Sequence, residues 1–458
     1  MPITCQEGLP AVRAEAALSP PAENRRSAQR LFAPPAGDCV QVLGGTPLRG
    51  EVAVSGAKNA ALPILAASLL FEDQVALENV PHVGDVQILA DVLRGLGVQI
   101  DSDADGALHA KVVNTQPHEA DRSLVERMRA SFCVLGPLLA RRGRAVVPLP
   151  GGCRIGPRPV DLHLRGLTAL GAKLRIEAGR VVATASRLRG ATVDLCGPRG
   201  TSVTGTANLL SAAVLAEGTT VIRGAAREPE IVDLGRFLQS AGADIDGLGT
   251  GTILVRGVRE LHAVRYRVVS DRIEAATLLV AGLVTGGDVQ VCGARPEHLT
   301  AVLGKLQAAG ARLTIDRDRI TATASRRLNG MDLATSAFPG VPTDVQPQWT
   351  TLAALALGTS RLRDGIFPER WGHLAALARF GAAFSRTGAD VRVYGRRRLI
   401  GGHVEALDLR GGAALLLAAL AADGESTIAG FHHVDRGYER LVEKISQLGG
   451  RLSRLPEC

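Results

Sequence analysis

One unit recurs six times along the chain, and this repeat constrains the fold more than any other feature. Each unit contains an amphipathic helix, a glycine and a short strand, with a period of about 70 residues. A glycine directly after a helix predicts a left-handed C-terminal cap, so each glycine is expected to end its helix. These glycines are Gly97, Gly171, Gly242, Gly310, Gly381 and Gly449.

A second kind of helix alternates with the first. It is rich in alanine and leucine and apolar on nearly every side, which predicts a buried helix. The six segments are NAALPILAASLL, ASFCVLGPLLA, ANLLSAAVLA, EAATLLVAGLV, QWTTLAALAL and GGAALLLAALA. Three such units in each of two domains would give an inside-out α/β architecture, with buried helices inside and sheets outside.

Composition narrows the class of protein. The chain has 458 residues, of which 46% are hydrophobic and 3% aromatic. Scarce aromatic residues argue against a stacking platform for single-stranded nucleic acid, and no basic tail is present. A net charge of +8 suits a protein that handles anions. The longest apolar stretches are too short to span a bilayer. Residues 1–38 lack periodicity and are predicted to be a disordered extension, with no secretory signal.

The seven cysteines have irregular spacing and include no CxxC pair. This spacing argues against a zinc site and against a disulfide framework, and it favours a reducing compartment. Cys133, Cys196 and Cys292 lie in apolar contexts, so we expect them to be inert core residues.

Cys153 has a different context, within PLPGGCRIGPRPVDLH at residues 148–163. The glycines and prolines exclude a regular helix and permit a loop that moves. Arg154 and Arg158 flank the thiol, and neighbouring cations lower a thiol pKa and raise its reactivity. Local chemistry alone leaves open whether Cys153 is functional. A second glycine-rich stretch, GPRGTSVTG at residues 197–205, is predicted to be a phosphate-contacting loop before a helix.

The residues before the six buried helices are polar: SGAKN, RMRAS, SVTGTAN, DRIEA, PTDVQPQ and DLRGG. A helix N-terminus offers free N–H groups to an anion. Ordinary capping explains the Ser, Thr and Asp residues. It does not explain Lys58, Arg129 and Arg410, because a cation opposes the helix dipole there. We therefore favour a basic site for phosphates and carboxylates, built from several helix starts.

Several stretches carry a family resemblance, among them GEVAVSGAKNAALPILAASLL, LPGGCRIGPRPVDLH, AAREPEIVDL, VPTDVQPQ and HHVDRGYER. In these stretches the chain resembles the enolpyruvyl transferases, specifically the UDP-N-acetylglucosamine 1-carboxyvinyltransferase family. The family fold has two inside-out α/β domains of three units each, and its first strand belongs to the C-terminal domain. The resemblance implies one domain at 59–268 and a second at 40–58 plus 269–458.

The resemblance also implies the site residues. The implied catalytic residues are Cys153, Asp344, Lys58 and Arg436. The implied phosphoenolpyruvate-binding residues are Lys58, Asn59, Arg129, Arg158, Asp408, Arg410 and Arg436. The implied UDP-sugar-binding residues are Asn59, Arg129, Arg158, Pro159, Val160, Asp161, Leu162, His163, Gly200, Thr201, Ser202, Val203, Asp344 and Ile366.

The implied reaction is an addition followed by an elimination. The sugar 3-hydroxyl attacks C2 of phosphoenolpyruvate while Cys153 protonates C3, and Asp344 is the candidate base. Neither a metal nor another cofactor is needed. The implied partners are the two small-molecule substrates, with no nucleic acid, membrane or obligate protein partner, and the implied location is the cytoplasm.

Three departures from the family pattern leave the acceptor open. Gly200 falls where some members have a lysine, FPERWGH replaces an Asn-Arg-Phe pattern, and FSRTGADVRVYGRRR is unusually basic. The acceptor is therefore either UDP-N-acetylglucosamine or another uridine nucleotide such as UMP. A non-catalytic UDP-sugar-binding regulator is a third hypothesis. The presence of Cys153, Asp344, Lys58 and Arg436 argues against that hypothesis.

Overall fold

Six buried helices form the interior of the protein, as their composition predicts. The structure, a computed structural model, describes residues 31–32, 37–151, 159–198, 200–324 and 327–456. The buried helices are α1 (Lys58–Ala67), α4 (Leu135–Arg142), α6 (Val203–Ala213), α8 (Arg272–Val284), α10 (Gln346–Leu355) and α12 (Leu409–Ala421). A 3-10 helix, η2 (Arg129–Val134), precedes α4. Helices α8, α10 and α12 pack on one another, and so do α1, α4 and α6 with η2.

The six amphipathic helices cover this interior, and each ends as the sequence predicts. They are α2 (Gly84–Gly95), α5 (Asp161–Ala169), α7 (Pro229–Ser240), α9 (Thr300–Ala308), α11 (Leu374–Arg379) and α14 (Leu441–Gln447). The six predicted capping glycines all have positive φ angles, between 82° and 102°. This left-handed backbone is the one that glycine adopts without steric cost. Shorter helical segments are η1 (Ser68–Leu70), α3 (Arg122–Val125), η3 (Pro296–His298), η4 (Thr343–Val345) and α13 (His432–Asp435).

Six sheets lie outside the helices in the described part of the chain. Three surround the first helix group, in the strand orders β13-β3-β5-β4, β6-β8-β7 and β11-β12-β10-β9. Their strands are β3 (Val75–Glu78), β4 (Val98–Ser102), β5 (Leu108–Val112), β6 (Arg144–Pro148), β7 (Lys173–Glu177), β8 (Arg180–Thr184), β9 (Thr192–Asp194), β10 (Thr219–Arg223), β11 (Asp244–Asp246), β12 (Thr252–Arg256) and β13 (Val264–Arg267). This arrangement confirms the inside-out α/β fold.

The other three sheets have the orders β21-β22-β1-β23, β15-β16-β14-β2 and β17-β18-β20-β19. Their strands are β1 (Cys39–Leu43), β2 (Arg49–Ala53), β14 (Asp288–Cys292), β15 (Arg312–Asp316), β16 (Arg319–Thr323), β17 (Asp332–Thr335), β18 (Thr359–Asp364), β19 (Ala383–Thr387), β20 (Asp390–Tyr394), β21 (His403–Glu405), β22 (Glu425–Ala429) and β23 (Arg451–Leu455). Strand β18 alternates exposed and buried residues along its whole length, as expected for a strand with one face on a core.

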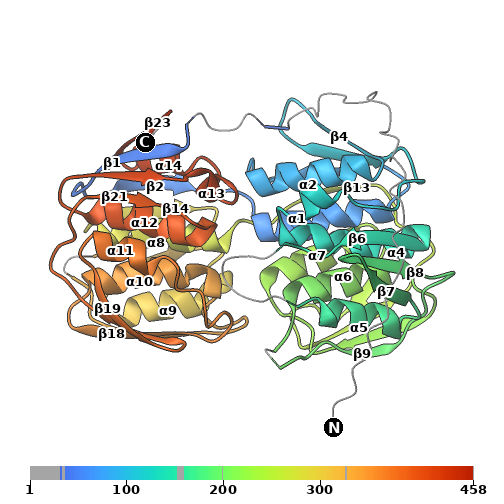
Figure 1. The fold of residues 1–458 in the computed structure, drawn as a ribbon. Helices are drawn as coiled ribbons and strands as arrows, with labels where there is room; N and C mark the ends of the chain where they lie inside the picture. The colour runs from blue at the N-terminus through green and yellow to red at the C-terminus, as the bar shows by residue number, and fades with distance from the viewer. Residues whose placement is uncertain (1–30, 33–36, 152–158, 199, 325–326, 457–458) are drawn as a thin grey trace, which may run out of the picture. The chain divides into compact units, whose positions relative to one another are not determined.

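The first two strands of the chain pair with late strands. Strand β1 is antiparallel to β22 and β23, and β2 is parallel to β14. Figure 1 shows both early strands, in blue, among the red and yellow elements. One hydrophobic core contains residues from Ala57 to Val269. A second contains residues of β1 and β2 together with residues from Ile273 to Leu448. The domain bounds implied by the resemblance stay a prediction.

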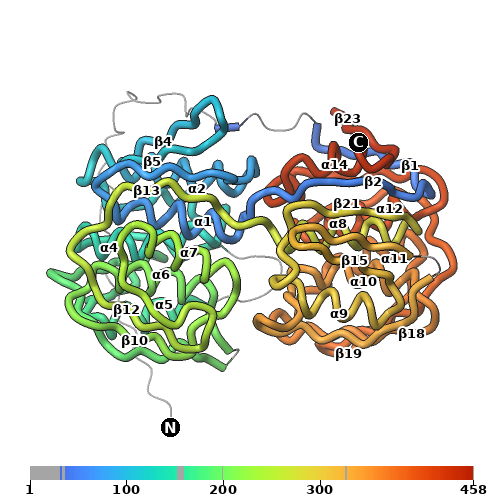
Figure 2. The backbone as a smooth tube through the Cα atoms, turned by 180° about the vertical axis from the view of Figure 1, so that it is seen from behind, coloured from blue at the N-terminus to red at the C-terminus, as the bar shows by residue number. Residues whose placement is uncertain are grey.

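The chain passes between the two cores twice, and the two passages are hydrogen-bonded to each other. Gly56 and Ser270 form an antiparallel bridge. The Ala57 N–H donates to the Val269 carbonyl at 2.6 Å, and the Asp271 N–H donates to the Ser55 carbonyl at 2.9 Å. Figure 2 shows the two passages, in blue and yellow. Lys58 and Arg272, at the starts of α1 and α8, directly follow them.

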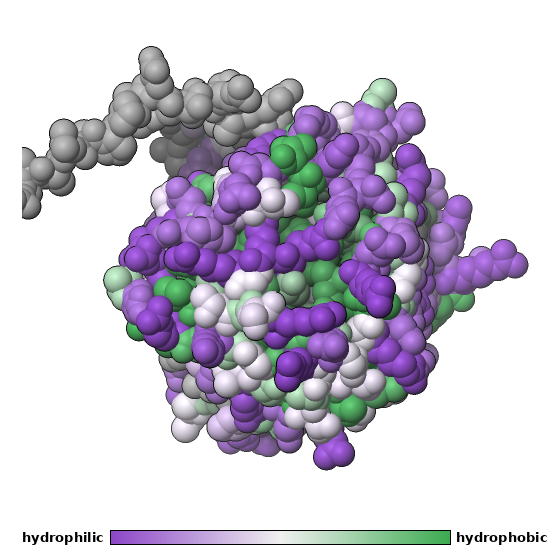
Figure 3. All heavy atoms as spheres, turned by 90° about the vertical axis from the view of Figure 1, so that its right-hand side faces the viewer, coloured by the Kyte–Doolittle hydropathy of each residue, from purple (hydrophilic) through white to green (hydrophobic). Residues whose placement is uncertain are grey.

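The face of the molecule at the right of Figure 1 is mainly polar. Figure 3 shows hydrophilic side chains in strips across the face that lies at the right of Figure 1, with small hydrophobic areas between them. No helix among the described residues is both long enough and apolar enough to span a membrane. At the N-terminal end of the described chain, Leu31 N–H donates to Gln87 Oε1 at 2.7 Å and Phe32 stacks on His82. Thus, these two residues of the predicted extension 1–38 contact the folded part; residues 1–30 and 33–36 lie outside the described chain.

The cysteines depart from prediction at three positions. Cys292 is only partly buried and belongs to neither hydrophobic core, so the prediction that it lies in the core is wrong. Cys133 is buried as expected and burial raises its thiol pKa to about 12, so it is an inert core residue. Cys196 is exposed, so the prediction that it lies in the core is wrong. It follows β9 in a loop at the surface, where an apolar sequence context does not ensure burial. Cys39 is disulfide-bonded, although the sequence predicted no disulfide framework.

Candidate active site

A carboxylate that holds three side-chain donors forms the centre of the candidate site. Asp344 lies in η4, directly before α10. Its Oδ1 accepts a hydrogen bond from Arg370 Nη1 at 2.8 Å. Its Oδ2 accepts from Arg410 Nη2 at 3.2 Å and from Asn59 Nδ2 at 3.3 Å. The structure thus brings together three predicted site residues, from the starts of α1, α10 and α12. We call Asp344, Asn59, Arg370 and Arg410 the Asp344 cluster.

The charges of this cluster determine the protonation state of its carboxyl group. Burial alone would raise the pKa of Asp344, but Arg410 and Arg370 outweigh burial and hold the pKa well below its ordinary value. A quarter of the Asp344 side chain (25%) stays exposed, whereas the two arginine side chains are only 2% and 6% exposed. Arg410 Nη1 and Arg370 Nε are buried donors without a hydrogen-bond partner among the described residues. The cluster therefore has both a negatively charged acceptor and spare cationic donors.

A second carboxylate organises two further predicted residues. Asp85, the second residue of α2, lies 2.6 Å from Lys58 Nζ through Oδ2 and 2.8 Å from Arg436 Nε through Oδ1. The Asp85 side chain is buried. Burial acts to raise its pKa, but the charges of Lys58 and Arg436 prevail and lower it. Arg436 also donates from Nη2 to the Arg127 carbonyl at 3.0 Å. We call Asp85, Lys58 and Arg436 the Asp85 cluster.

Part of the predicted nucleotide site lies on the first core. Arg129, the first residue of η2, donates from Nη2 to the Pro159 carbonyl at 2.9 Å. Helix α5 begins two residues later at Asp161, and the side chain of His163 is buried in that helix. Val160, Asp161 and Pro159 are at least partly exposed, whereas Leu162 packs on the core.

His163 has a network of its own inside the first core. Its Nδ1 lies 2.8 Å from Asn208 Nδ2 and its Nε2 lies 3.1 Å from Thr204 Oγ1. Because an amide nitrogen can only donate, Nδ1 must accept, and the proton sits on Nε2. Burial, aided by the charge of Arg129, lowers the pKa of His163 to about 3, so the ring is neutral. These contacts account for the side chain without a ligand.

Capping explains several of the polar helix starts. Ser202 Oγ accepts from the Gly205 N–H at 3.0 Å and caps α6. Asp271 caps α8, and Asp408 Oδ1 caps α12 by accepting from the Arg410 and Gly411 N–H groups. The capping alternative is therefore correct for these three residues. Lys58 and Arg410 do not cap, and both are held in ion pairs instead.

The remaining predicted residues lie around these groups. The backbone N–H groups of Ile366 and Phe367 donate to Asp364, whose other oxygen accepts from Thr343, the neighbour of Asp344. Gly200, Thr201 and Val203 surround the start of α6, and Val203 is exposed. Cys153 and Arg158 lie outside the described residues, so their predicted roles stay predictions.

Two members of the clusters were not predicted. Arg370 lies in FPERWGH, a segment singled out only because it departs from the family pattern. Asp85 looks in sequence like an ordinary acidic residue in the first turn of an amphipathic helix, which the helix dipole alone explains. Its role is revealed only by its contacts with Lys58, 27 positions earlier, and Arg436, 351 positions later.

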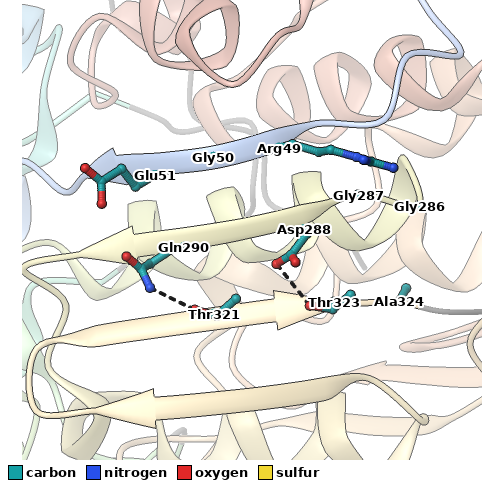
Figure 4. A pocket seen from close by; sticks show the side chains of 10 residues that line it. All are labelled: Arg49, Gly50, Glu51, Gly286, Gly287, Asp288, Gln290, Thr321, Thr323 and Ala324. Carbon is teal, nitrogen blue, oxygen red and sulfur yellow. Dashed lines mark hydrogen bonds between the residues drawn. The ribbon is translucent and has the colours of Figure 1, made fainter.

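Neither a metal site nor a surface hollow provides an alternative to these clusters in the described chain. No group of three or more His, Cys, Asp or Glu residues suited to a metal occurs in the described chain. A surface hollow of about 750 Å³ lies on the sheet β15-β16-β14-β2, where Figure 4 shows its polar side chains. It is lined by Arg49, Gly50, Glu51, Gly286, Gly287, Asp288, Gln290, Thr321, Thr323 and Ala324. No predicted site residue lines it.

Comparisons with known proteins identify the family of the chain. The model of the family EPSP synthase (3-phosphoshikimate 1-carboxyvinyltransferase) matches residues 42–445. The chain belongs to this family of enolpyruvyl transferases. A UDP-N-acetylglucosamine 1-carboxyvinyltransferase from Methylacidiphilum infernorum is 44% identical over 90% of this chain and 98% of its own length. The same enzyme from Dichelobacter nodosus is 45% identical over 92% of this chain and 99% of its own.

A solved structure shows the same fold. The enolpyruvyl transferase NikO from Streptomyces tendae superimposes with a TM-score of 0.81 at 27% identity, covering 92% of this chain and 99% of its own. The chain is therefore an enzyme of the enolpyruvyl transferase family, and the resemblance seen in the sequence is confirmed. The Asp85 and Asp344 clusters contain five residues that the resemblance assigned to the substrate site: Lys58, Asn59, Asp344, Arg410 and Arg436.

Proposed function

We propose that this enzyme transfers the enolpyruvyl group of phosphoenolpyruvate to the 3-hydroxyl of UDP-N-acetylglucosamine, with release of phosphate, in the cytoplasm. The single observation that carries the proposal is the Asp344 cluster, in which a partly exposed carboxylate lies beside spare arginine donors. Relatives that are named UDP-N-acetylglucosamine 1-carboxyvinyltransferase are 42–45% identical to this chain over most of its length. NikO is 27% identical.

Asp344 is the group that would receive the proton of the sugar hydroxyl. The hydroxyl oxygen bonds to C2 of phosphoenolpyruvate, C3 gains a proton, and a tetrahedral intermediate forms. Loss of a C3 proton and cleavage of the C2–O bond to phosphate then give the enol ether. In the free enzyme Asp344 is a weak base, because Arg410 and Arg370 lower its pKa. Negative charge from phosphoenolpyruvate near these arginines would offset them and make the carboxylate more basic.

The cations supply the other part of the chemistry. We assign Lys58, Arg410 and Arg436, with Arg129 and Arg158, to the phosphate and carboxylate groups of the substrates. Fixed cations that face developing negative charge stabilise a transition state without reorganisation. The buried carboxylate of Asp85 keeps Lys58 and Arg436 close together before the substrate arrives. Such pre-organisation removes part of the cost of binding.

Cys153 is proposed as the acid that protonates C3. A Cys153→Ser variant should lose about 100-fold or more in kcat, because a serine hydroxyl is a much weaker acid than a thiol. Phosphate release during a single turnover measures this step. A variant that keeps full activity would remove the assignment and leave the rest of the proposal standing.

The acceptor is tested directly by comparing UDP-N-acetylglucosamine with UMP. The departures from the family pattern near Gly200 keep UMP as a second candidate. We expect phosphoenolpyruvate-dependent phosphate release with the UDP-sugar and none with UMP. Release with UMP alone would overturn the proposed acceptor but not the reaction type.

A further inference from the structure

A buried tyrosine hydroxyl lies behind the Asp344 cluster. Tyr438 follows Arg436 by two residues, and the residue is only 1% exposed. Its hydroxyl is 2.9 Å from Thr277 Oγ1 of α8 and 2.8 Å from the side-chain amide of Gln348 in α10. Three polar side chains from three separate elements thus meet inside the second core, where an unsatisfied polar group is costly.

The Gln348 amide connects this hydroxyl to Asp344. If its oxygen faces the two hydroxyls, it accepts from Thr277 at 3.0 Å and from Tyr438 at 2.8 Å. Its nitrogen then donates to the carbonyls of Asp344 at 3.2 Å and Val345 at 3.3 Å. The opposite orientation would place the amide oxygen against two carbonyl oxygens, which cannot donate. The amide therefore joins the tyrosine to the backbone of η4.

The tyrosine ring makes a second connection. The guanidinium carbon of Arg410 lies over the Tyr438 ring, 5.1 Å from its centroid, at the distance of a cation–π contact. Arg410 in turn donates to the Asp344 carboxylate. Burial raises the pKa of Tyr438, although Arg410 opposes the rise, so the hydroxyl stays protonated.

The segment that carries Tyr438 also abuts the Asp85 cluster. Gly437 packs so closely on Leu409 and Lys58 that a Cβ atom there would lie 2.7 Å from a Leu409 side-chain carbon and 3.2 Å from Lys58 Cδ. The backbone N–H groups of Gly437 and Tyr438 both donate to the Val434 carbonyl. A displaced tyrosine would therefore disturb Arg436 and Lys58 as well as Arg410.

We propose that Tyr438 is a positioning residue for the transfer reaction. It holds Arg410 through its ring and Asp344 through its hydroxyl and Gln348, and it touches no substrate. The inference rests on the proposed function, because it assumes that Asp344 receives the acceptor's proton. Neither the sequence nor the family resemblance assigned a role to Tyr438 or Gln348.

Tyr438→Phe tests the hydroxyl and keeps the ring. We expect kcat to fall about tenfold, because the Gln348 amide and Asp344 lose a fixed orientation. The KM values of both substrates should stay within about twofold and the unfolding midpoint within about 3 °C. A purely structural role would lower the midpoint and leave kcat unchanged, which would overturn the proposal.

Tyr266→Phe is the matched control. The Tyr266 hydroxyl donates to Asp233 Oδ1 at 2.7 Å, in the first core and outside both clusters. Its removal should change kcat by less than about twofold. An equal loss of kcat in both variants would mean that any buried tyrosine hydroxyl affects turnover, and the proposal would fail.

Gln348→Met provides a second route if Tyr438→Phe does not fold. It should reduce kcat by a similar factor. Because the two side chains act in series, the kcat of the double variant should be no lower than that of the less active single variant. Strictly additive losses of kcat, on a logarithmic scale, would contradict the connection.

Wild-type phosphate release with UDP-N-acetylglucosamine or UMP is measured first. Absence of turnover with both acceptors would contradict the proposed function. If the wild-type enzyme is active, the kcat values of the variants test only the role of Tyr438.

Discussion

The Asp85 and Asp344 clusters have similar composition, but their carboxylates differ in exposure. Each contains one carboxylate between two cations, and in each the cations lower the carboxyl pKa against the effect of burial. Asp85 is closed off, with both oxygens occupied and a side chain 4% exposed. Asp344 keeps 25% of its side chain exposed. Burial separates a carboxylate that holds cations in place from one that can meet a substrate.

The arginines of the two clusters also differ in how their N–H groups are paired. Around Asp344, Arg410 and Arg370 retain buried N–H groups without partners in the described chain. Buried guanidinium donors are normally paired, so these two arginines carry positive charge that the Asp344 carboxylate does not fully engage. Around Asp85, the Arg436 guanidinium is shared between a carboxylate and the Arg127 carbonyl. The comparison therefore predicts a loss of turnover from changes at Asp344, and weaker substrate binding with a smaller loss of turnover from changes at Asp85.

The largest effect is expected for Asp344→Asn. An amide cannot take up the hydroxyl proton, so kcat should fall about 1,000-fold, within the range of general base catalysis. The unfolding midpoint should fall as well, because Arg410 and Arg370, whose side chains are only 2% and 6% exposed, lose the charge that compensates them. Phosphate release and thermal unfolding measure the two quantities. A kcat within tenfold of wild type would make Asp344 an orienting group and not the base.

A smaller loss of turnover, together with a loss of stability, is expected for Asp85→Asn. Removal of the Asp85 charge leaves Lys58, whose side chain is 10% exposed, without compensation, whereas Arg436 at 35% exposed is partly hydrated. The free energy of unfolding should fall by about 3 kcal/mol. Lys58 and Arg436 would lose their alignment, so the KM of phosphoenolpyruvate should rise about 30-fold, with a smaller change in kcat. Urea unfolding and steady-state kinetics measure these effects.

Asp91 of the same helix offers the control for this variant. Its carboxylate pairs with Arg94 three residues later and is partly exposed. Asp91→Asn should cost less than about 1 kcal/mol, as is usual for exposed pairs. An equal cost at Asp91 and Asp85 would contradict the claim that the closed cluster is the exceptional one.

The pH dependence of stability should also distinguish Asp85 from Asp344, with smaller differences than the kinetic effects. A carboxyl group with a lowered pKa stabilises the folded state above its unfolded pKa, and it loses that contribution as the pH falls through its folded pKa. The wild-type advantage over Asp85→Asn should therefore be constant from about pH 5 to 8 and shrink below about pH 4. Because Asp344 is held well below its ordinary pKa, its advantage should persist to lower pH. Urea unfolding at several pH values measures both; an advantage that grows in acid would reverse the sign.

The repeat explains why so much of the fold could be predicted. Helix periodicity, apolar helices and capping glycines are local signals, and at all six glycines the local signal agrees with the final backbone. The site was less accessible to sequence reasoning. Lys58 and Arg410 stood out because cations at helix starts oppose the dipole, and they do contact carboxylates. Asp85, Arg370 and Tyr438 carried no such local signal, since their partners lie far away in sequence.

The smallest effect is expected for His163, a predicted nucleotide contact that the structure buries. His163→Leu should lower the free energy of unfolding by about 2 kcal/mol, because Asn208 and Thr204 each lose a partner. The KM of the UDP-sugar should stay within about twofold if, like Asp85, the side chain serves the interior. Since its folded pKa is lowered to about 3, the neutral ring makes wild type less stable as the pH falls below about 6.5.

The leucine variant removes this titration, so its stability should depend less on pH between about 4.5 and 7.5. Unfolding in urea at those two pH values measures the dependence, and initial rates at varied UDP-sugar concentrations measure the KM. A KM raised about tenfold with unchanged stability would place His163 against the nucleotide. The contrast between a buried and a partly exposed side chain would then explain the roles of Asp85 and Asp344 but not the role of His163.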